Sequence, residues 1–244
     1  MSIPCGWQIN ALNIPEMRDN FPIARVGVHH IPRIFMRLLT LRAVSILLGV
    51  SLFCCTPAGI AAATADIQTI VLLRHGEKPD AGLGQLNCQG LNRALALPRV
   101  LETKYGKPDV IFAPDPAVQK KDHDIFYSYV RPLATIEPSA IYFGLPVNAT
   151  IDFSRTDDLR NALLAPQYRR SLLVVAWEHH IIEKLARQIV VEYGGDRASV
   201  PHWEDTDFDS LYLLRIVRDG SGARINFSVD KQGLNDRPLT CPYA

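Results

Sequence analysis

Short, mostly apolar runs alternate with longer amphipathic stretches along residues 66–244, and this alternation constrains the fold more than any other feature of the chain. The apolar runs suit strands of a parallel sheet, which are buried on both faces. The stretches between them carry apolar residues at helical spacing. Strands that alternate with helices predict an α/β three-layer sandwich, with a mostly parallel central sheet and helices on both faces.

The predicted strands are Gln68–Leu73, Asp109–Phe112, Val147–Thr150 and Ser171–Ala176, and the predicted helices are Leu91–Tyr105, Pro132–Phe143, Asp157–Leu164 and Ile181–Tyr193. Proline lacks the N–H that a helix interior needs, so we expect Pro98 to interrupt the first helix and Pro138 to kink or break the second. Two later strands, Leu211–Val217 and Ile225–Val229, flank a turn at 219–222. They predict an antiparallel hairpin at one edge of the sheet.

The beginning of the chain predicts export. No residue of Ala43–Ala65 is charged, Arg37 and Arg42 precede this stretch, and its end has the small-x-small pattern of a cleavage site. These features are typical of a secretory signal peptide at 36–65. The alternative is a membrane anchor, because an uncharged stretch of this length can just span a bilayer. A signal peptide does not normally follow a polar leader, so we expect residues 1–35 to be poorly structured and translation to start at Met36.

The remaining residues, 66–244, are then one domain that is periplasmic or secreted, or that an uncleaved anchor holds outside the cytoplasm. Contact with a membrane is expected only in the second case. Two of the five cysteines, Cys88 and Cys241, lie in this domain. In an exported protein they can form one disulfide or remain two buried thiols, and the sequence leaves both open.

The charge balance excludes a typical nucleic-acid-binding domain. The chain has 26 Lys and Arg residues against 25 Asp and Glu residues, and the basic residues form no stripe or patch. Domains that bind nucleic acid usually show such a basic patch. Hydrophobic residues make up 48% of the chain, which also excludes wholesale disorder.

Polar side chains that suit phosphate binding stand where the apolar runs end. Arg74 and His75 follow the first run, Glu178 and His179 lie just beyond the fourth, and Arg131 opens a helix. Active sites of α/β folds lie past the carboxyl ends of the strands. Guanidinium groups and a helix N-terminus suit a phosphate dianion. An imidazole between guanidinium groups tends to stay neutral, which leaves a ring nitrogen free to attack phosphorus.

Several segments resemble the motifs of the histidine phosphatase superfamily, which has the phosphoglycerate-mutase-like fold. Val71–Pro79 is similar to its nucleophile motif, Leu86–Leu101 to its first helix, Arg131–Thr135 to its R-x-x-x-T motif, and Val174–His179 to its second-histidine segment. A late segment, Trp203–Asp209, is similar to one in a small exported bacterial subgroup with a Trp-Glu-His string. The resemblance covers nearly all of 66–244.

The resemblance implies an exported phosphomonoesterase. His75 would attack the phosphoryl group of a small phosphorylated substrate and become a phosphohistidine. Arg74, Arg131 and His179 would bind the phosphoryl oxygens, and neither a metal nor an organic cofactor would be required. The alternatives are a phosphotransferase or mutase of the same fold, and a non-catalytic phosphate-binding protein on that scaffold.

The general acid is the role that the sequence assigns least clearly. Glu178, where the family usually has a small residue, is one candidate, and Asp152, just past a predicted strand, is its rival. His180 is expected to be structural. The segment Lys120–His123 is expected to be a solvated loop, or alternatively to meet an anionic substrate, within a longer loop at 113–129 that should set specificity. No cysteine or histidine spacing supports a metal site.

Overall fold

The computed structural model describes residues 65–243, so the predicted leader and nearly all of the predicted signal peptide or anchor lie outside the described residues. Within the described range, six strands form one sheet in the order β5-β2-β6-β1-β7-β8, and β3 and β4 pair separately. The strands are β1 (Asp66–Arg74), β2 (Val110–Pro114), β3 (Gln119–Asp122), β4 (Ile125–Ser128), β5 (Val147–Ile151), β6 (Leu172–Trp177), β7 (Ser210–Asp219) and β8 (Gly222–Lys231). The α-helices are α1 (Cys88–Tyr105), α2 (Arg131–Phe143), α3 (Thr156–Leu163) and α4 (His179–Glu192).

The predicted sheet is confirmed, including its antiparallel edge. Strands β5, β2, β6 and β1 run parallel to one another, whereas β7 pairs antiparallel with β1 and with β8. The turn between β7 and β8 falls within 219–222, as predicted. None of the helices between residues 65 and 243 is both long and apolar enough to span a bilayer.

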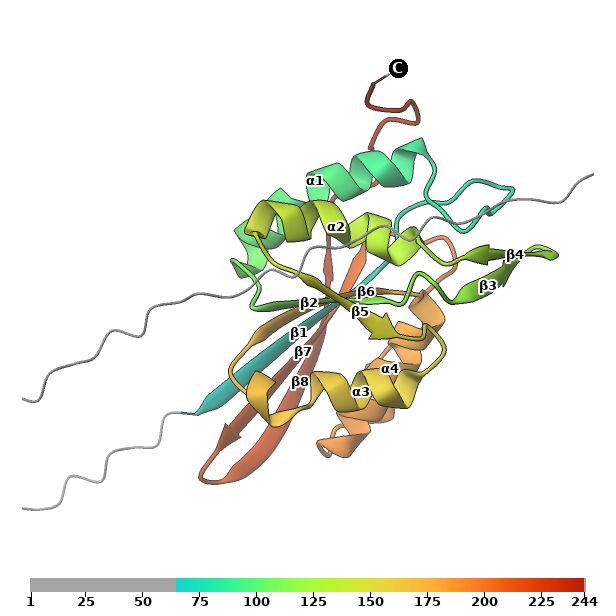
Figure 1. Ribbon diagram of the computed structural model, residues 1–244. Helices are drawn as coiled ribbons and strands as arrows, with labels where there is room; N and C mark the ends of the chain where they lie inside the picture. Colours follow the sequence, from blue (N-terminus) through green and yellow to red (C-terminus); the bar gives the residue numbers. More distant parts are fainter. Residues whose placement is uncertain (1–64, 244) are drawn as a thin grey trace, which may run out of the picture. The chain divides into compact units, whose positions relative to one another are not determined.

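Strand β1 shows why the central runs are apolar throughout. Ile70 and Leu72 belong to the core that includes α3 and α4, while Val71 and Leu73 belong to the core that includes α1 and α2. Successive side chains of a strand point to opposite faces, so a strand covered on both faces needs apolar residues at every position. Figure 1 shows the two helix pairs on opposite faces of the sheet. The three-layer sandwich predicted from the sequence is therefore confirmed.

Neither internal proline ends its helix. Both α1 and α2 continue past their internal prolines, Pro98 and Pro138, so the predicted interruption of the first helix and break of the second are wrong. In α1 the proline is itself buried beside Leu97 and Leu101. The burial of this apolar face stabilises the helix by more than the lost hydrogen bond destabilises it.

Helices α1 and α4 begin three and two residues earlier than their periodicity predicts, because a side chain caps each of them. Asn87 accepts a hydrogen bond from the Gly90 amide, and α1 starts at Cys88. Glu178 accepts from the Ile181 amide, and α4 starts at His179. N-cap side chains of this kind satisfy amides that have no partner within the helix. As a result, the predicted second histidine is the first residue of α4.

The segment predicted as a solvated loop at Lys120–His123 is instead part of a β-hairpin. Strands β3 and β4 pair antiparallel around His123, whose φ of 53° lies in the left-handed region. The last residue of β3, Asp122, is buried. Hydrophilic composition suggested a loop, but the alternation of exposed and covered side chains along β3 is that of a strand. Figure 1 shows this hairpin projecting beside the start of α2.

Of the two states left open for the cysteines, the structure has the disulfide. Cys88 and Cys241 are bonded, with their Cα atoms 4.6 Å apart. Next to this bond, the Asn92 side chain donates to the carbonyl groups of Pro238 and Thr240. The C-terminal segment is thereby attached to the first turns of α1.

Candidate active site

The pairing of β1 with β6 brings the two predicted histidine segments together. Arg74 is in register with Trp177, and the His75 amide donates to the Trp177 carbonyl at 3.0 Å. The residues that follow these strands, His75 on one and Glu178 on the other, therefore leave the sheet side by side. This edge is the carboxyl end of the parallel strands, where α/β folds place their ligands.

His75 is buried, and its ring orientation is set by its own backbone. Its side chain is 3% exposed, and Nδ1 lies 2.8 Å from the Gly76 carbonyl oxygen. A carbonyl only accepts, so Nδ1 carries a proton and Nε2 is left as the unprotonated nitrogen of a neutral ring. Burial, together with the positive charges of Arg131 and Arg74, holds the pKa of the His75 imidazole well below its usual range. A neutral Nε2 has the lone pair that a nucleophile needs.

Arg74 is held from the side of the loop that precedes β7. Its Nη1 donates to the backbone carbonyl groups of Asp205 and Asp207, at 2.5 and 3.2 Å. Its guanidinium carbon lies 3.9 Å from the centre of the Phe208 ring, a cation–π contact. These contacts fix the plane of the guanidinium, while its Nε is buried and has no partner among residues 65–243.

Arg131, the first residue of α2, is held from the opposite side by the β3–β4 hairpin. Its Nη1 pairs with the Asp122 carboxylate, which also binds Lys78 at 3.3 Å. Burial raises the pKa of the Asp122 carboxyl, but Arg131 and Lys78 bring it below its usual value. The Tyr129 ring lies 5.0 Å from the guanidinium carbon of Arg131. The Nε of this second arginine is also buried without a partner in the described part of the chain.

Close backbone packing joins the loop at 75–79, which contains the predicted nucleophile His75 and is called the nucleophile loop below, to α1 and α2. The Gly76 amide donates to Thr135 Oγ1, and that hydroxyl donates to the Arg131 carbonyl. A Cβ added to Gly90 would lie 2.4 Å from the Glu77 carbonyl oxygen, so no larger residue fits at that position of α1 without displacing backbone. The threonine of the R-x-x-x-T motif thus connects the nucleophile loop to the helix that begins with the second arginine.

Glu178 and Asp205 contact the two nitrogens of the His179 ring. Glu178 Oε1 lies 3.0 Å from Nδ1, and Asp205 Oδ1 lies 2.7 Å from Nε2. Burial by itself raises the pKa of Glu178, but contact with His179, the charge of Lys120 and the Ile181 amide lower it to about 2. Glu178 is therefore ionised in the resting site, so it can accept a proton, and it can donate one only after gaining it.

Three buried polar groups next to His75 lack a partner among residues 65–243. They are Arg74 Nε, Arg131 Nε and the Tyr129 hydroxyl. The Tyr129 ring meets the His75 ring edge-on, at 6.1 Å between centroids. Leaving a buried donor unsatisfied costs about 1–3 kcal/mol, so native proteins rarely have several together. All three groups can donate a hydrogen bond to an oxygen atom. The surroundings of His75 therefore suit an oxyanion as ligand.

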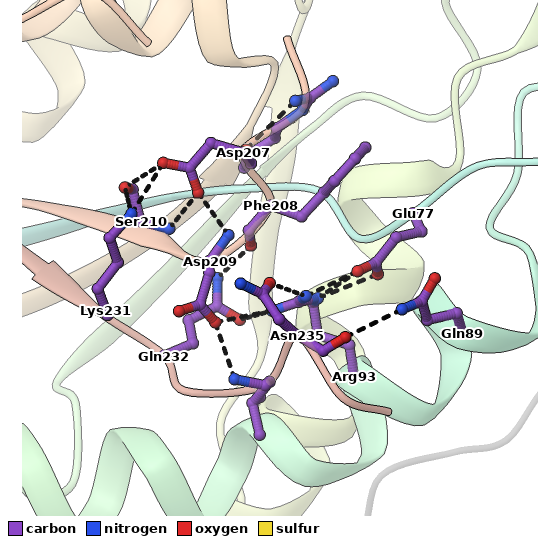
Figure 2. A network of polar contacts seen from close by, with 12 residues as sticks. Glu77, Gln89, Arg93, Asp207, Phe208, Asp209, Ser210, Lys231, Gln232 and Asn235 are labelled. Carbon is purple, nitrogen blue, oxygen red and sulfur yellow. Dashed lines mark hydrogen bonds and ion pairs between the residues drawn. The ribbon is translucent and has the colours of Figure 1, made fainter. Parts of the chain in front are cut away.

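Behind the nucleophile loop lies a buried ion network centred on Arg93 (Figure 2). Arg93 is fully buried, donates through Nε and Nη2 to the carboxylate of Glu77, and pairs through Nη1 with Asp209 at 3.2 Å. The side chains of Gln232 and Asn235 accept its remaining N–H groups. The network therefore connects the nucleophile loop, α1, the start of β7 and the C-terminal segment.

Asp207 supports the same loop from its other end. Figure 2 shows its carboxylate between Ser210 and Lys231. Burial raises the pKa of Asp207, but the hydroxyl of Ser210, the Lys231 ammonium and two backbone amides lower it to about 2. Since the carbonyl of Asp207 and the ring of Phe208 both contact Arg74, this ionised carboxylate helps to hold the first arginine in place.

The structure brings together five of the predicted site residues and gives the two remaining candidates, Asp152 and His180, other polar contacts. Arg74, His75, Arg131, Glu178 and His179 surround one place at the carboxyl edge of the sheet. The carboxylate of Asp152 instead accepts from the amide and hydroxyl of Ser154, in the loop after β5. The side chain of His180 is 57% exposed, lies 3.4 Å from Asp205, and has its ring centroid 3.9 Å from that of His179.

Sequence reasoning gave no role to four residues that shape the site: Arg93, Asp122, Tyr129 and Phe208. A buried arginine on an amphipathic helix looks like a surface residue, because its partners are supplied by distant segments. The tyrosine lies only two positions before Arg131, but proximity in the chain does not predict a contact with His75. Two of the four had a signal: Asp122 lies in the Lys120–His123 segment, for which contact with an anionic substrate was the alternative, and Phe208 lies within the late Trp203–Asp209 resemblance.

No family model and no curated protein matches the chain. Solved structures similar to it include phosphatases and a phosphoglycerate mutase. One is a protein from Nakamurella multipartitia assigned as the phosphohistidine phosphatase SixA, with 17% identity, covering 69% of this chain and 97% of that one at a TM-score of 0.42. A mycobacterial glucosyl-3-phosphoglycerate phosphatase in complex with inorganic phosphate has 15% identity, and the match covers 66% of this chain and 95% of that one at a TM-score of 0.43. Phosphoglycerate mutase from Plasmodium falciparum has 14% identity, and the match covers 66% of this chain and 89% of that one at a TM-score of 0.41.

The fold class rests on the sheet order and the two helix layers of this chain, and the chemistry rests on its own side chains.

Proposed function

We propose that the protein is an exported phosphomonoesterase that works through a phosphohistidine on His75. The observation that carries the proposal is the set of buried, unpartnered groups, Arg74 Nε, Arg131 Nε and the Tyr129 hydroxyl, next to a neutral imidazole. A phosphoryl group has the oxygens that these groups need, and its phosphorus is the electrophile that a neutral Nε2 can attack.

The reaction has two steps. In the first, Nε2 of His75 forms a bond to phosphorus while the bond from phosphorus to the ester oxygen breaks, and the leaving oxygen takes a proton. In the second, water attacks the phosphohistidine, the P–N bond breaks, and inorganic phosphate leaves. Arg74 and Arg131, with His179, stabilise the charge on the phosphoryl oxygens in both steps. None of these steps requires a metal.

We assign the proton transfers to Glu178. Its carboxylate lies against His179 at the start of α4, and a bound phosphate dianion would raise its pKa by like-charge repulsion. The carboxyl group would then give a proton to the leaving oxygen and take one back from the attacking water. Asp152 is the rival for this role, but its carboxylate accepts a hydrogen bond from the Ser154 amide.

Trapping of the intermediate tests the proposal. Full-length protein turning over radiolabelled p-nitrophenyl phosphate should, when quenched in alkali, carry label that is stable to base and labile to acid. The label should map to the peptide with Arg74 and His75, and it should be lost in His75→Ala. The matched control is His180→Ala, which removes an exposed imidazole and should keep the label. A chelator should leave the rate unchanged.

Other outcomes separate the alternatives. Turnover without a trapped intermediate, or full turnover by His75→Ala, would refute the nucleophile assignment. Transfer of phosphate to added glycerol in preference to water would identify a phosphotransferase. Binding of inorganic phosphate without any turnover would identify a phosphate-binding protein. Export is tested by mass spectrometry of the native N-terminus, which we expect to begin at Asp66.

A further inference from the structure

One cation near the site, Lys120 on β3, has no role in the steps above. Side chains alternate along this strand: Gln119 and Lys121 are exposed, Lys120 is half-buried and Asp122 is buried. Residues two apart on a strand share a face. Since Asp122 pairs with Arg131, the face that carries Lys120 is the one directed toward the phosphate-binding arginines.

The surroundings of Lys120 are aromatic and contain no counter-ion within reach. Its Nζ lies 4.9 Å from the centre of the Tyr129 ring and 5.2 Å from that of Phe153. No carboxylate of residues 65–243 lies at ion-pair distance from this ammonium, whereas Lys78 and Lys121 each have one, at 3.3 and 3.1 Å. A half-buried ammonium has lost part of its hydration, so an anion would stabilise it.

The acidic groups that attract Lys120 already have other partners. The two oxygens of Glu178 contact His179 Nδ1 and the Ile181 amide, and Asp122 pairs with Arg131 and Lys78. The Tyr129 ring, in turn, lies against both Lys120 and His75. A small molecule whose phosphoryl group is at His75 therefore needs to extend only past one ring to reach the ammonium.

We propose that Lys120 binds a second anionic group of the substrate, a carboxylate or a second phosphate, while Arg74 and Arg131 hold the phosphoryl group that is transferred. This proposal rests on the proposed phosphomonoesterase activity. In this proposal Lys120 sets substrate specificity, and the β3–β4 hairpin positions the Lys120 side chain.

Matched pairs of substrates test this inference. 3-Phosphoglycerate differs from glycerol 3-phosphate by a carboxylate, and glucose 1,6-bisphosphate differs from glucose 6-phosphate by a second phosphate. The full-length protein should prefer the doubly anionic member of at least one pair in kcat/KM, and the pair that shows the preference identifies the group. In Lys120→Met this preference should fall at least tenfold, chiefly through KM, and Lys120→Arg should restore part of it.

The matched control is Lys121→Met. This neighbour on β3 faces solvent and pairs with Asp124, so its loss should leave both the preference and the activity unchanged. Thermal midpoints within about 2 °C of each other would show that both variants fold, since a kcal/mol of stability shifts the midpoint of such a domain by several degrees.

Two results would overturn the inference while leaving the proposed activity intact. The first is His75-dependent turnover with no preference in either pair, or with a preference that Lys120→Met does not change. The second is a fall in kcat/KM in Lys120→Met that grows with the basicity of the leaving group, whether or not the substrate carries a second anionic group. That result would make Lys120 a proton donor. If no phosphomonoester is hydrolysed, the proposed function fails. Calorimetric binding of the same pairs to wild type and Lys120→Met then decides whether the subsite exists.

Discussion

The Nδ1–H of His75 donates to the carbonyl oxygen of Gly76, the next residue in the chain, at 2.8 Å. This short-range hydrogen bond decides which ring nitrogen is available for chemistry. It needs no second side chain to orient the imidazole, because the backbone of the nucleophile loop is itself held by Thr135 and by the close approach of Gly90. The nitrogen that we propose as the nucleophile is therefore positioned through the backbone of its own loop, which Thr135 and Gly90 hold.

The first prediction concerns the protonation of His75. Nitrogen NMR of the full-length protein should show His75 as the Nδ1-protonated tautomer, neutral at pH values well below the ordinary histidine pKa of about 6.5. The urea-unfolded protein provides the reference titration. Observation of a protonated Nε2 at neutral pH would contradict the assignment of this atom as nucleophile.

The same shift has a consequence for stability. Because the folded-state pKa of His75 is lowered, the unfolded chain binds this proton more readily, and acidification favours unfolding. The contribution is fully present above about pH 6.5 and is lost as the pH falls toward the folded-state value, by at most about 1.4 kcal/mol per pH unit. The difference in unfolding free energy between wild type and His75→Asn, measured in urea, should therefore change in favour of the variant between pH 7 and pH 5.

The second prediction is that Arg131→Lys retains the charge but loses much of the activity. Lysine can pair with Asp122, but it lacks the planar fork and the Nε–H that remains free for a ligand. We expect a loss of about 2–4 kcal/mol in transition-state stabilisation, comparable to the loss of one oxyanion donor. Steady-state kinetics with p-nitrophenyl phosphate measures the loss, and urea unfolding should show a much smaller change. Unaltered kcat/KM would remove Arg131 from the phosphate site.

The third prediction separates the two candidate acids. Glu178→Gln should slow hydrolysis of an alkyl phosphate far more than that of p-nitrophenyl phosphate, because a good leaving group needs little protonation. Asp152→Asn is the matched variant and should slow neither, since its carboxylate interacts with Ser154. Equal slowing of both substrates by Glu178→Gln, with a leaving-group effect in Asp152→Asn, would transfer the role to Asp152.

The fourth prediction concerns the network behind the nucleophile loop. Arg93→Met leaves the carboxylates of Glu77 and Asp209 without their buried partner and should lower the unfolding free energy by about 3–5 kcal/mol. Arg99→Met, on the same helix but in an exposed pair with Glu102, should change it by less than about 1 kcal/mol. Urea unfolding of both variants makes the comparison. Similar small effects would show that the network contributes little to stability.

Much of the fold and part of the site could be predicted from the sequence because they depend on local patterns. Residues 70–73 are apolar at every position because a central strand is covered on both sides. The Arg74–His75 pair is recognisable because it follows such a strand directly. The same local reasoning was wrong about Pro98, where burial of the helix face outweighs one lost hydrogen bond, and about Lys120–His123, where hydrophilic side chains belong to a hairpin.

Local sequence patterns were enough to predict the layers of the sandwich, its main strands and helices, and the two arginines and two histidines of the candidate site. The contacts around the site could be found only in the folded chain: Asp122 on Arg131, Phe208 under Arg74, Glu77 on Arg93, and Lys120 over Tyr129. The physical reason is that strand and helix periodicity depends on neighbouring residues, whereas these contacts depend on strand register and on loops packed across the sheet edge. Periodicity can be read along the chain, but a contact between distant segments exists only once the chain has folded.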